Sequence, residues 1–281
     1  MTQSLSQLRQ ICLDHPGGSV QLVQITDCHL GKVPGSTLLG MDTDHSLQAV
    51  VDLVLRERGH TDLVLGTGDL SDHGANPAYR RLRDYFHQVC EHSFWLPGNH
   101  DSWTDMWADS GPNAQMSNEI RVSNWQIVML NSQIPGEVGG ELGCGQLALL
   151  GDCLKRASYE GLHSLVCLHH QPVAIGSAWI DAQMLADADQ FFQVLERYNC
   201  VRGVLWGHVH QQIEQQRGDL ALLASPSTCV QFTPGLPGFK VDDKPPGYRW
   251  MDLHDDGSID TGISRVEGVS FSVELDSGGY L

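Results

Sequence analysis

The sequence predicts an α/β protein with a β-rich C-terminal part, and three observations lead to this fold class. Apolar runs rich in Val, Ile and Leu alternate with segments of helical periodicity through residues 20–206. After residue 206, strand-like runs follow one another without helical segments between them. The chain has 281 residues, 41% hydrophobic and 18% charged, which suits a soluble globular protein with one large core. We therefore expect one domain over residues 1–281, mainly β-structure from about residue 211.

The expected elements of the body alternate regularly. Strands are predicted at residues 20–26, 62–66, 93–96, 125–131, 164–168 and 201–206. Helices are predicted at residues 43–58, 77–90, 146–157 and 186–198. The first helix has apolar side chains on one face, and the second has Pro77 at its start, where a missing N–H costs nothing.

The C-terminal part has a different pattern. Strands are expected at residues 212–216, 220–224 and 248–253, and Asp256-Gly257 is typical of a hairpin turn. Residues 234–247 are rich in Pro and Gly and should form a long loop, and the tail after Gly268 should be weakly ordered.

Charge and composition exclude several classes of partner. The net charge of −17 repels nucleic-acid polymers, because their binding requires many Lys and Arg contacts to phosphates. No apolar run approaches the roughly 20 residues that span a bilayer, and residues 1–10 lack the apolar stretch of a signal peptide. The eight cysteines form no Cys-x-x-Cys pair, which favours a reducing compartment. We expect a cytoplasmic protein with no membrane or nucleic-acid partner, and a dimer is compatible with the sequence.

Polar clusters follow five of the predicted strands. They are Asp27-x-His29, Gly68-Asp69, Gly98-Asn99-His100-Asp101, His169-His170 and Gly207-His208-x-His210. Each alone also fits a polar turn or a packed histidine. Because loops beyond the carboxyl ends of strands in α/β sheets converge on one crevice, the five clusters together predict a single site.

The residue types in these clusters suit metal-assisted phosphate chemistry. Carboxylate, amide and imidazole ligands without thiolate favour Mn, Fe, Zn or Mg over a closed structural zinc site. Two ions about 3.5–4 Å apart can clamp an oxyanion and provide a nucleophile near neutral pH, as phosphate ester hydrolysis requires. His100 would be the proton donor, with Asp101 orienting its ring.

In this order, the clusters resemble those of the calcineurin-like metallophosphoesterase superfamily over about residues 27–210. Within it, the chain most resembles the class III 3′,5′-cyclic-AMP phosphodiesterases of bacteria, the CpdA type. The features that support this resemblance are Gly68-Asp69-Leu70-Ser71-Asp72, His169-His170-Gln171-Pro172-Val173 leading to Ser177-Ala178-Trp179, and residues 225–232. Only residues 225–232 lie beyond the core shared by the superfamily, so they carry the assignment to this group.

The resemblance implies a fold, a ligand assignment and a reaction. The fold is a four-layer αββα sandwich of two mixed sheets flanked by helices. One ion would be held by Asp27, His29 and His210, the other by Asn99, His169 and His208, and Asp69 would bridge them. The ions would be Fe²⁺ or Mn²⁺, with Zn²⁺ or Mg²⁺ as alternatives. The reaction would be direct hydrolysis of cyclic AMP to 5′-AMP, with His100 protonating the leaving oxygen. The residues expected to contact this small cyclic nucleotide are His29, Asp69, Asn99, His100, His169 and His210.

Other functions remain open at this stage. The same site could serve a broader phosphodiesterase for glycerophosphodiesters or 2′,3′-cyclic nucleotides, or the fold could be a non-catalytic scaffold. A protein Ser/Thr phosphatase is disfavoured, because His73 stands where those enzymes have Arg. A related nuclease is disfavoured by the acidic charge.

The sequence also suggests where a base could bind. An aromatic wall could come from residues 174–181, which contain Trp179, or from residues 225–232, which contain Phe232 and the hydroxyls of Ser227 and Thr228. The alternative is that both rings are ordinary packing residues.

Overall fold

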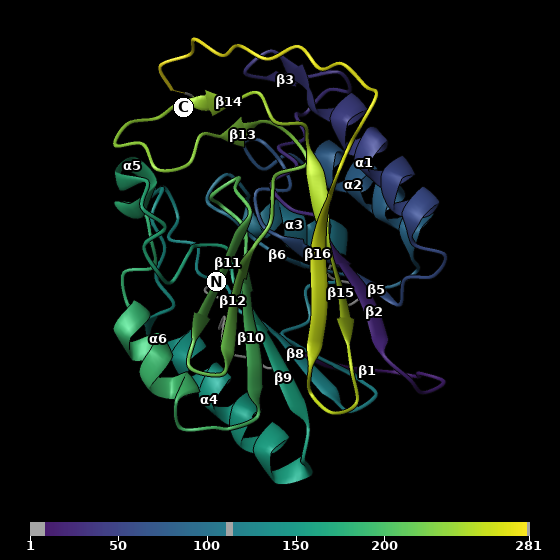
Figure 1. Cartoon of the computed structure of the whole chain (residues 1–281), viewed down its shortest axis with the longest axis vertical. Helices are drawn as coiled ribbons and strands as arrows, with labels where there is room; N and C mark the ends of the chain where they lie inside the picture. Colours follow the sequence, from purple (N-terminus) through teal and green to yellow (C-terminus); the bar gives the residue numbers. More distant parts are fainter. Residues whose placement is uncertain (1–8, 111–114, 280–281) are drawn as a thin grey trace.

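Four layers make up the computed structural model, which describes residues 9–110 and 115–279 (Figure 1). Two mixed β-sheets lie face to face, and helices cover the outer side of each sheet. This arrangement confirms the predicted αββα sandwich. The prediction that residues 1–10 do not form a signal peptide concerns mainly residues 1–8, which lie outside the described residues.

The larger sheet has seven strands, four of which are parallel neighbours in its centre. Helices α4 (Gly143–Glu160) and α6 (Ala188–Leu195) cover its outer face through buried residues such as Leu150, Leu154 and Phe191. The strand order is β1 (Gln10–Leu13), β7 (Glu119–Val122), β8 (Trp125–Met129), β9 (His163–Cys167), β10 (Val201–Trp206), β12 (Leu220–Ala224) and β11 (Ile213–Arg217).

The smaller sheet has five strands, and its outer face carries three helices. The helices are α1 (Thr43–Glu57), α2 (Asn76–Val89) and α3 (Trp103–Ser110). The strand order is β16 (Ile259–Arg265), β15 (Gly247–Leu253), β2 (Val20–Gln24), β5 (Leu63–Thr67) and β6 (Ser93–Leu96). Strands β15 and β16 pair antiparallel around Asp256-Gly257, which confirms the predicted hairpin.

The inner faces of the two sheets share one apolar core. Leu22, Leu65 and Met251 from the small sheet pack with Ile127 and Leu205 from the large one, each at most 1% exposed. Burial of each such side chain stabilises the fold by about 1.5–3 kcal/mol. This core holds the sheets in one relative position, so that the ends of β2, β5, β6, β9 and β10 meet at the same edge.

Several elements differ from the expectation. Strands β1 and β7 and helices α3 and α5 (Ala178–Asp181) were not predicted, and α4 is longer and α6 shorter than expected. Short strand pairs also occur: β3 (Thr37–Leu38) with β4 (Met41–Asp42), and β13 (Gln231–Phe232) with β14 (Val241–Asp242). The second pair places a strand inside the segment expected to be a long loop.

The C-terminal tail is held against the body, so the expectation of a weakly ordered tail is wrong. Phe271 and Val273 pack against the apolar core, and the Glu274 N–H donates to the Leu39 carbonyl at 2.8 Å. Two half-buried apolar side chains and a backbone hydrogen bond therefore anchor a segment without regular structure. No helix in the described ranges has both the length and the apolar content that crossing a bilayer requires.

Candidate metal centre

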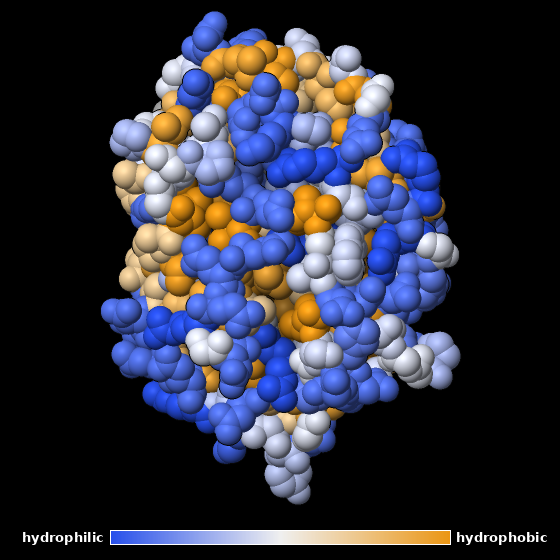
Figure 2. All heavy atoms as spheres, viewed as in Figure 1, coloured by the Kyte–Doolittle hydropathy of each residue, from blue (hydrophilic) through white to orange (hydrophobic). Residues whose placement is uncertain are grey.

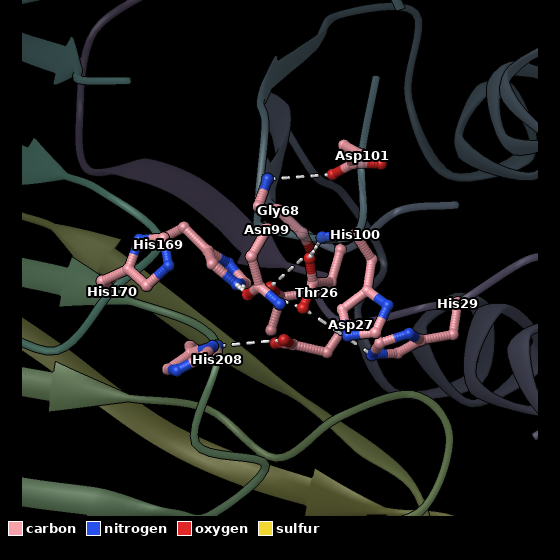
Figure 3. Close-up of polar contacts among 12 residues, drawn as sticks. Thr26, Asp27, His29, Gly68, Asn99, His100, Asp101, His169, His170 and His208 are labelled. Atoms are coloured by element: carbon pink, nitrogen blue, oxygen red, sulfur yellow. Dashed lines mark hydrogen bonds and ion pairs between the residues drawn. The ribbon is translucent and has the colours of Figure 1, made fainter. Parts of the chain in front are cut away.

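All seven predicted ligands lie at the edge where strands of both sheets end. Figure 3 labels five of them: Asp27, His29, Asn99, His169 and His208. The loops are joined by backbone hydrogen bonds, from the Asp27 N–H to the Gly68 carbonyl at 3.0 Å and from the His29 N–H to the Asp69 carbonyl at 2.9 Å. Asp27 and His29 follow β2, Asp69 follows β5, Asn99 follows β6, His169 follows β9, and His208 and His210 follow β10.

The backbone is strained where these ligands lie. Of the eight described non-glycine residues with positive φ, five are predicted ligands. A side chain in this region costs about 1–3 kcal/mol of strain, which persists only where the surroundings enforce it. The five are Asp27 (54°), His29 (46°), Asp69 (49°), His208 (66°) and His210 (49°).

Three glycines allow the loops to approach one another closely. A Cβ atom on Gly68 would lie 2.2 Å from His169 Nδ1, and one on Gly98 would lie 2.2 Å from Asp69 Oδ1. A Cβ atom on Gly207 would lie 2.8 Å from Asp27 Oδ2. Only glycine leaves space for the neighbouring ligand at these positions.

Asp27, His29 and His210 form the first group of ligand atoms, all within 4.8 Å of one another. His210 Nε2 lies 3.5 Å from Asp27 Oδ1 and 3.3 Å from His29 Nε2. His210 Nδ1 donates to the Val230 carbonyl at 2.8 Å, so Nε2 faces the site with its lone pair. Imidazole nitrogens that converge in this way suit a cation between them.

Asn99, His169 and His208 form the second group. His169 Nδ1 donates to the Thr67 carbonyl at 2.8 Å, and Nε2 lies 3.2 Å from Asn99 Oδ1. The ring of His208 lies 5.1 Å from that of His169, centroid to centroid. The tautomer of His169 is therefore the one that presents Nε2 as a ligand.

Asp69 lies between the two groups. Its Oδ2 atom is 3.2 Å from His169 Nε2 and 3.9 Å from His29 Nε2, so one carboxylate reaches both groups. Burial alone would raise the pKa of Asp69, but His169 and His100 beside it hold this pKa well below its usual value. The Asp69 carboxylate is therefore placed between the two groups of predicted ligands.

Three of the predicted ligands have electrostatic properties that suit metal ions, whereas the pKa of His169 is raised to about 9 because Asp69 beside it outweighs the effect of burial. Among the described residues, the buried atoms Asp27 Oδ2 and His208 Nε2 have no hydrogen-bond partner. Burial and the nearby His100 lower the pKa of His29 to about 3, and burial lowers that of His208 as well. Histidine side chains bind divalent cations as neutral imidazoles. A cation at this position would also satisfy the buried atoms that have no hydrogen-bond partner.

His100 lies beside this centre and pairs with a carboxylate that the sequence did not indicate. Its backbone N–H donates to Asp69 Oδ1 at 2.8 Å, and its ring Nδ1 lies 3.4 Å from Asp72 Oδ1. Burial would lower the pKa of His100, but Asp69 and Asp72 raise it above its usual value. A protonated ring at this position can donate a proton.

The prediction that Asp101 orients the His100 ring is wrong. Asp101 is buried, and its two oxygens accept hydrogen bonds from the backbone N–H groups of Gly98 (2.9 Å), Leu70 (3.2 Å) and Ser71 (2.9 Å). It also accepts from the Tyr79 hydroxyl at 2.8 Å. Asp101 therefore ties two ligand loops together, and its carboxylate faces their backbones.

Comparison with known proteins identifies the family of this chain. Residues 20–212, more than half of the chain, match the family described as calcineurin-like phosphoesterase. The chain belongs to this family. It is 46% identical over 262 residues to the 3′,5′-cyclic adenosine monophosphate phosphodiesterase CpdA of Pseudomonas aeruginosa, covering 93% of this chain and 96% of that protein.

Other calcineurin-like phosphoesterases are similar at greater distance. The CpdA phosphodiesterase of Escherichia coli K12 is 36% identical over 264 residues, covering 93% of this chain and 95% of that protein. A solved dimetal phosphatase from Danio rerio has the same fold, with a TM-score of 0.62 at 14% identity. The similarity covers 89% of this chain and all of that one.

In this calcineurin-like phosphoesterase, the two segments expected to hold a base pack against the metal centre and each other. Phe232 is 1% exposed and stacks on His210, with ring centroids 4.1 Å apart and 7° between planes. Trp179 meets Phe232 edge-on at 5.2 Å. The Ser227 hydroxyl donates to the Asp27 carbonyl at 2.7 Å, and the Thr228 N–H donates to the Thr26 carbonyl at 3.1 Å. These contacts favour the packing interpretation for Phe232.

Proposed function

We propose that this calcineurin-like phosphoesterase hydrolyses 3′,5′-cyclic AMP to 5′-AMP with two divalent ions. The observation that carries the proposal is the position of Asp69, within 3.9 Å of a histidine from each ligand group. The substrate follows from relatives that are named as cyclic-AMP phosphodiesterases and are covered almost completely by this chain.

The proposed ligands of one ion are Asp27, His29 and His210. Asn99, His169 and His208 would hold the other, and Asp69 would bridge the pair. Such ions supply Lewis acidity toward the phosphate oxygens, a nucleophile near neutral pH and a template for the substrate. The mixed oxygen and nitrogen donors favour Fe²⁺ or Mn²⁺, with Zn²⁺ or Mg²⁺ as alternatives.

His100 is the proposed general acid. Asp72 lies 3.4 Å from Nδ1 of the ring, and we assign Nε2 as the atom that donates a proton to the departing 3′ oxygen of the ribose. Asp69 holds the backbone of His100, so the acid is placed relative to the bridging ligand. The phosphate would contact His29, Asp69, Asn99, His100, His169 and His210.

The proposed biological role is to lower cyclic AMP in the cytoplasm. A net charge of −17 supports a small substrate over a nucleic-acid polymer. We also propose that residues 1–281 act as one domain, because β15 and β16 extend the sheet that contains β2 and β5. A broader phosphodiesterase would use the same centre and differ only in substrate range.

A substrate panel tests the proposal. Purified protein, stripped of metal and reloaded with Mn²⁺ or Fe²⁺, would be assayed on 3′,5′-cyclic AMP, 3′,5′-cyclic GMP, 2′,3′-cyclic AMP and glycerophosphocholine. We expect the highest kcat/KM for 3′,5′-cyclic AMP, with 5′-AMP as product. A higher kcat/KM for glycerophosphocholine or 2′,3′-cyclic AMP would favour the broader function, and no turnover with any metal would favour a scaffold.

A further inference from the structure

The turn that follows β8 contains none of the proposed ligands, yet it contacts two of the loops that carry them. We refer to residues 131–133 as the β8 turn. Strand β8 pairs parallel with β9 in the seven-stranded sheet, so the β8 turn leaves the sheet at the same edge as His169, which follows β9. The β8 turn is therefore placed to support the metal centre from one side.

Gln133 of the β8 turn binds both ends of the loop that carries Asn99 and His100. Its Nε2 atom donates to the Gly98 carbonyl at 2.7 Å and to the Asp101 carbonyl at 2.5 Å. A carboxamide nitrogen has two hydrogens, and here both have acceptors. The two hydrogen bonds bracket a proposed metal ligand and the proposed general acid.

Ser132 of the β8 turn contacts a second ligand loop. Its buried hydroxyl lies 2.8 Å from Nδ1 of His170, the residue that directly follows His169. His169 Nε2 in turn lies 3.2 Å from Asn99 Oδ1. The β8 turn thus contacts the loops of two residues that we assign to the same ion, the one held by Asn99, His169 and His208. We call this ion the second ion.

The β8 turn is itself held by hydrogen bonds. The Asn131 N–H donates to Oε1 of Gln146, on helix α4, at 3.0 Å. The Gln133 N–H donates to Asn131 Oδ1 at 2.9 Å, and the Ser132 carbonyl accepts from the Glu141 N–H at 3.0 Å. A support whose own backbone is fixed can hold a neighbouring loop in one position.

We propose that Gln133 is a positioning residue for the second ion and for the general acid. It holds both ends of one loop, and so it places the Asn99 oxygen relative to His169 and the His100 ring relative to the substrate. Groups that orient metal ligands from behind typically account for roughly 10- to 100-fold in metal affinity. This inference rests on the proposed two-ion centre.

A metal titration of Gln133→Met tests the proposal. Methionine has a similar length and volume but no N–H donor, so the variant loses both hydrogen bonds to the loop. Metal-free protein would be titrated with Mn²⁺, and the bound ions would be counted by mass spectrometry. The Kd of one ion should rise roughly 10- to 100-fold, and the Kd of the other should keep its wild-type value.

Gln126→Met is the matched control. Gln126 is buried near the start of β8, at the opposite end of the strand from the β8 turn. Its Nε2 atom also donates twice, to Glu119 Oε1 at 2.7 Å and to the Cys153 carbonyl at 3.2 Å. The melting temperature should fall in both variants, but Gln126→Met should bind both ions as the wild type does.

The control also accounts for weak binding of Mn²⁺ at the surface. Hydrophilic side chains cover most of the face shown in Figure 2, and the net charge is −17. Neither substitution removes a carboxylate, so surface binding affects both variants equally. A difference between their titrations therefore reports on the metal centre.

A second measurement reports on His100. With enough Mn²⁺ to fill both sites, the variants would be assayed on cyclic AMP and on methyl p-nitrophenyl phosphate, whose leaving group needs no proton. In Gln133→Met, kcat for cyclic AMP should fall about 10-fold more than kcat for the nitrophenyl ester, because a displaced acid costs only the reaction that needs it. Gln133→Asn, which is one methylene shorter, should show both effects to a smaller extent and serves if Gln133→Met does not fold.

The outcomes separate this inference from the proposed function. Wild-type Kd values for both ions in a folded Gln133 variant, or equal weakening of both ions, would overturn the positioning role. The same loss of metal affinity in Gln126→Met would show that general destabilisation causes it. A wild-type protein that binds two ions but does not hydrolyse cyclic AMP would overturn the proposed function, and the metal titration would still decide the role of Gln133.

Discussion

Replacing Asp72 by Asn should slow the hydrolysis of cyclic AMP and lower the stability of the fold only slightly. The substitution keeps the shape of the side chain and an acceptor oxygen for His100 Nδ1, but it removes the negative charge 3.4 Å away. The Asp72 side chain is 25% exposed, so the change should lower the free energy of unfolding by no more than about 1–2 kcal/mol, the energy of its pairing with His100. Any loss of activity would then report on the His100 ring.

The expected size of the loss follows from the distance and the exposure. Two unit charges about 4 Å apart near a protein surface interact by roughly 4 kcal/mol. Solvent around Asp72 reduces this to about 1–2 kcal/mol. If this energy supports the proton donor in the transition state, kcat for cyclic AMP should fall roughly 5- to 30-fold.

The same substitution should change the pH profile. Because Asp72 raises the pKa of His100, the loss of Asp72 lowers that pKa. The alkaline limb of the pH–kcat profile, where His100 loses its proton, should therefore move to lower pH.

The assay compares two leaving groups. The 3′ oxygen of cyclic AMP leaves as a basic alkoxide and needs a proton, whereas p-nitrophenolate does not. Asp72→Asn should therefore lower kcat for cyclic AMP much more than for methyl p-nitrophenyl phosphate. Equal losses on both substrates would refute the acid role of the His100–Asp72 pair.

Asp101 provides the matched contrast. Asp101→Ala removes the acceptor of three backbone N–H groups, at about 1–3 kcal/mol each when left unpaired. We expect it to destabilise the protein by about 3–5 kcal/mol and to lower the melting temperature by roughly 6–20 °C. A stable Asp101→Ala variant with the leaving-group selectivity expected of Asp72→Asn would show that the two carboxylates have been assigned the wrong roles.

Three further predictions concern the metal centre. Asp69→Ala should weaken both ions and Asn99→Ala mainly one, as measured by metal content after dialysis; two tightly held ions in Asp69→Ala would exclude the bridge. Gly207→Ala would place a Cβ atom 2.6 Å from Thr26 Oγ1 and 2.8 Å from Asp27 Oδ2, so the variant should bind less metal and have a lower melting temperature. A variant with the metal content of the wild type would contradict the close packing of these loops. Removal of metal by a chelator should lower the melting temperature, because ions at 100 times their Kd stabilise the folded state by about 2.7 kcal/mol; an unchanged melting temperature would argue against tight binding at these ligands.

The sequence predicted the layers, and it predicted that the candidate ligands come together, because strands and the polar clusters that follow them leave local signals. The strands of the inner core are continuous apolar runs, and each ligand follows such a run directly, as Asp69 follows β5. Edge elements leave weaker signals. Strand β1 has an alternating, half-exposed pattern, and its partner β7 begins with Glu119, which is 109 residues from Gln10. Pairing over such a distance cannot be inferred from either segment alone.

The orientation of side chains within the site was the least predictable feature. Asp101 adjoins His100 in the sequence, yet its carboxylate faces the backbone of Ser71 and Leu70. Asp72 lies 28 residues from His100 in the sequence, yet its carboxylate reaches the His100 ring at 3.4 Å from a loop in which Asp69 has a left-handed conformation. Backbone conformation and contacts between loops decide which carboxylate meets the histidine, and spacing in the sequence does not report either.

The most direct test of the account is a metal titration of the stripped protein that follows bound ions and cyclic-AMP turnover together. Increasing Mn²⁺ would be added to a fixed concentration of chain, with bound metal measured by mass spectrometry and product by chromatography. The account predicts two ions per chain, with 5′-AMP formed in proportion to chains that hold both. Full activity with one ion per chain, or two bound ions without hydrolysis of cyclic AMP, would contradict it.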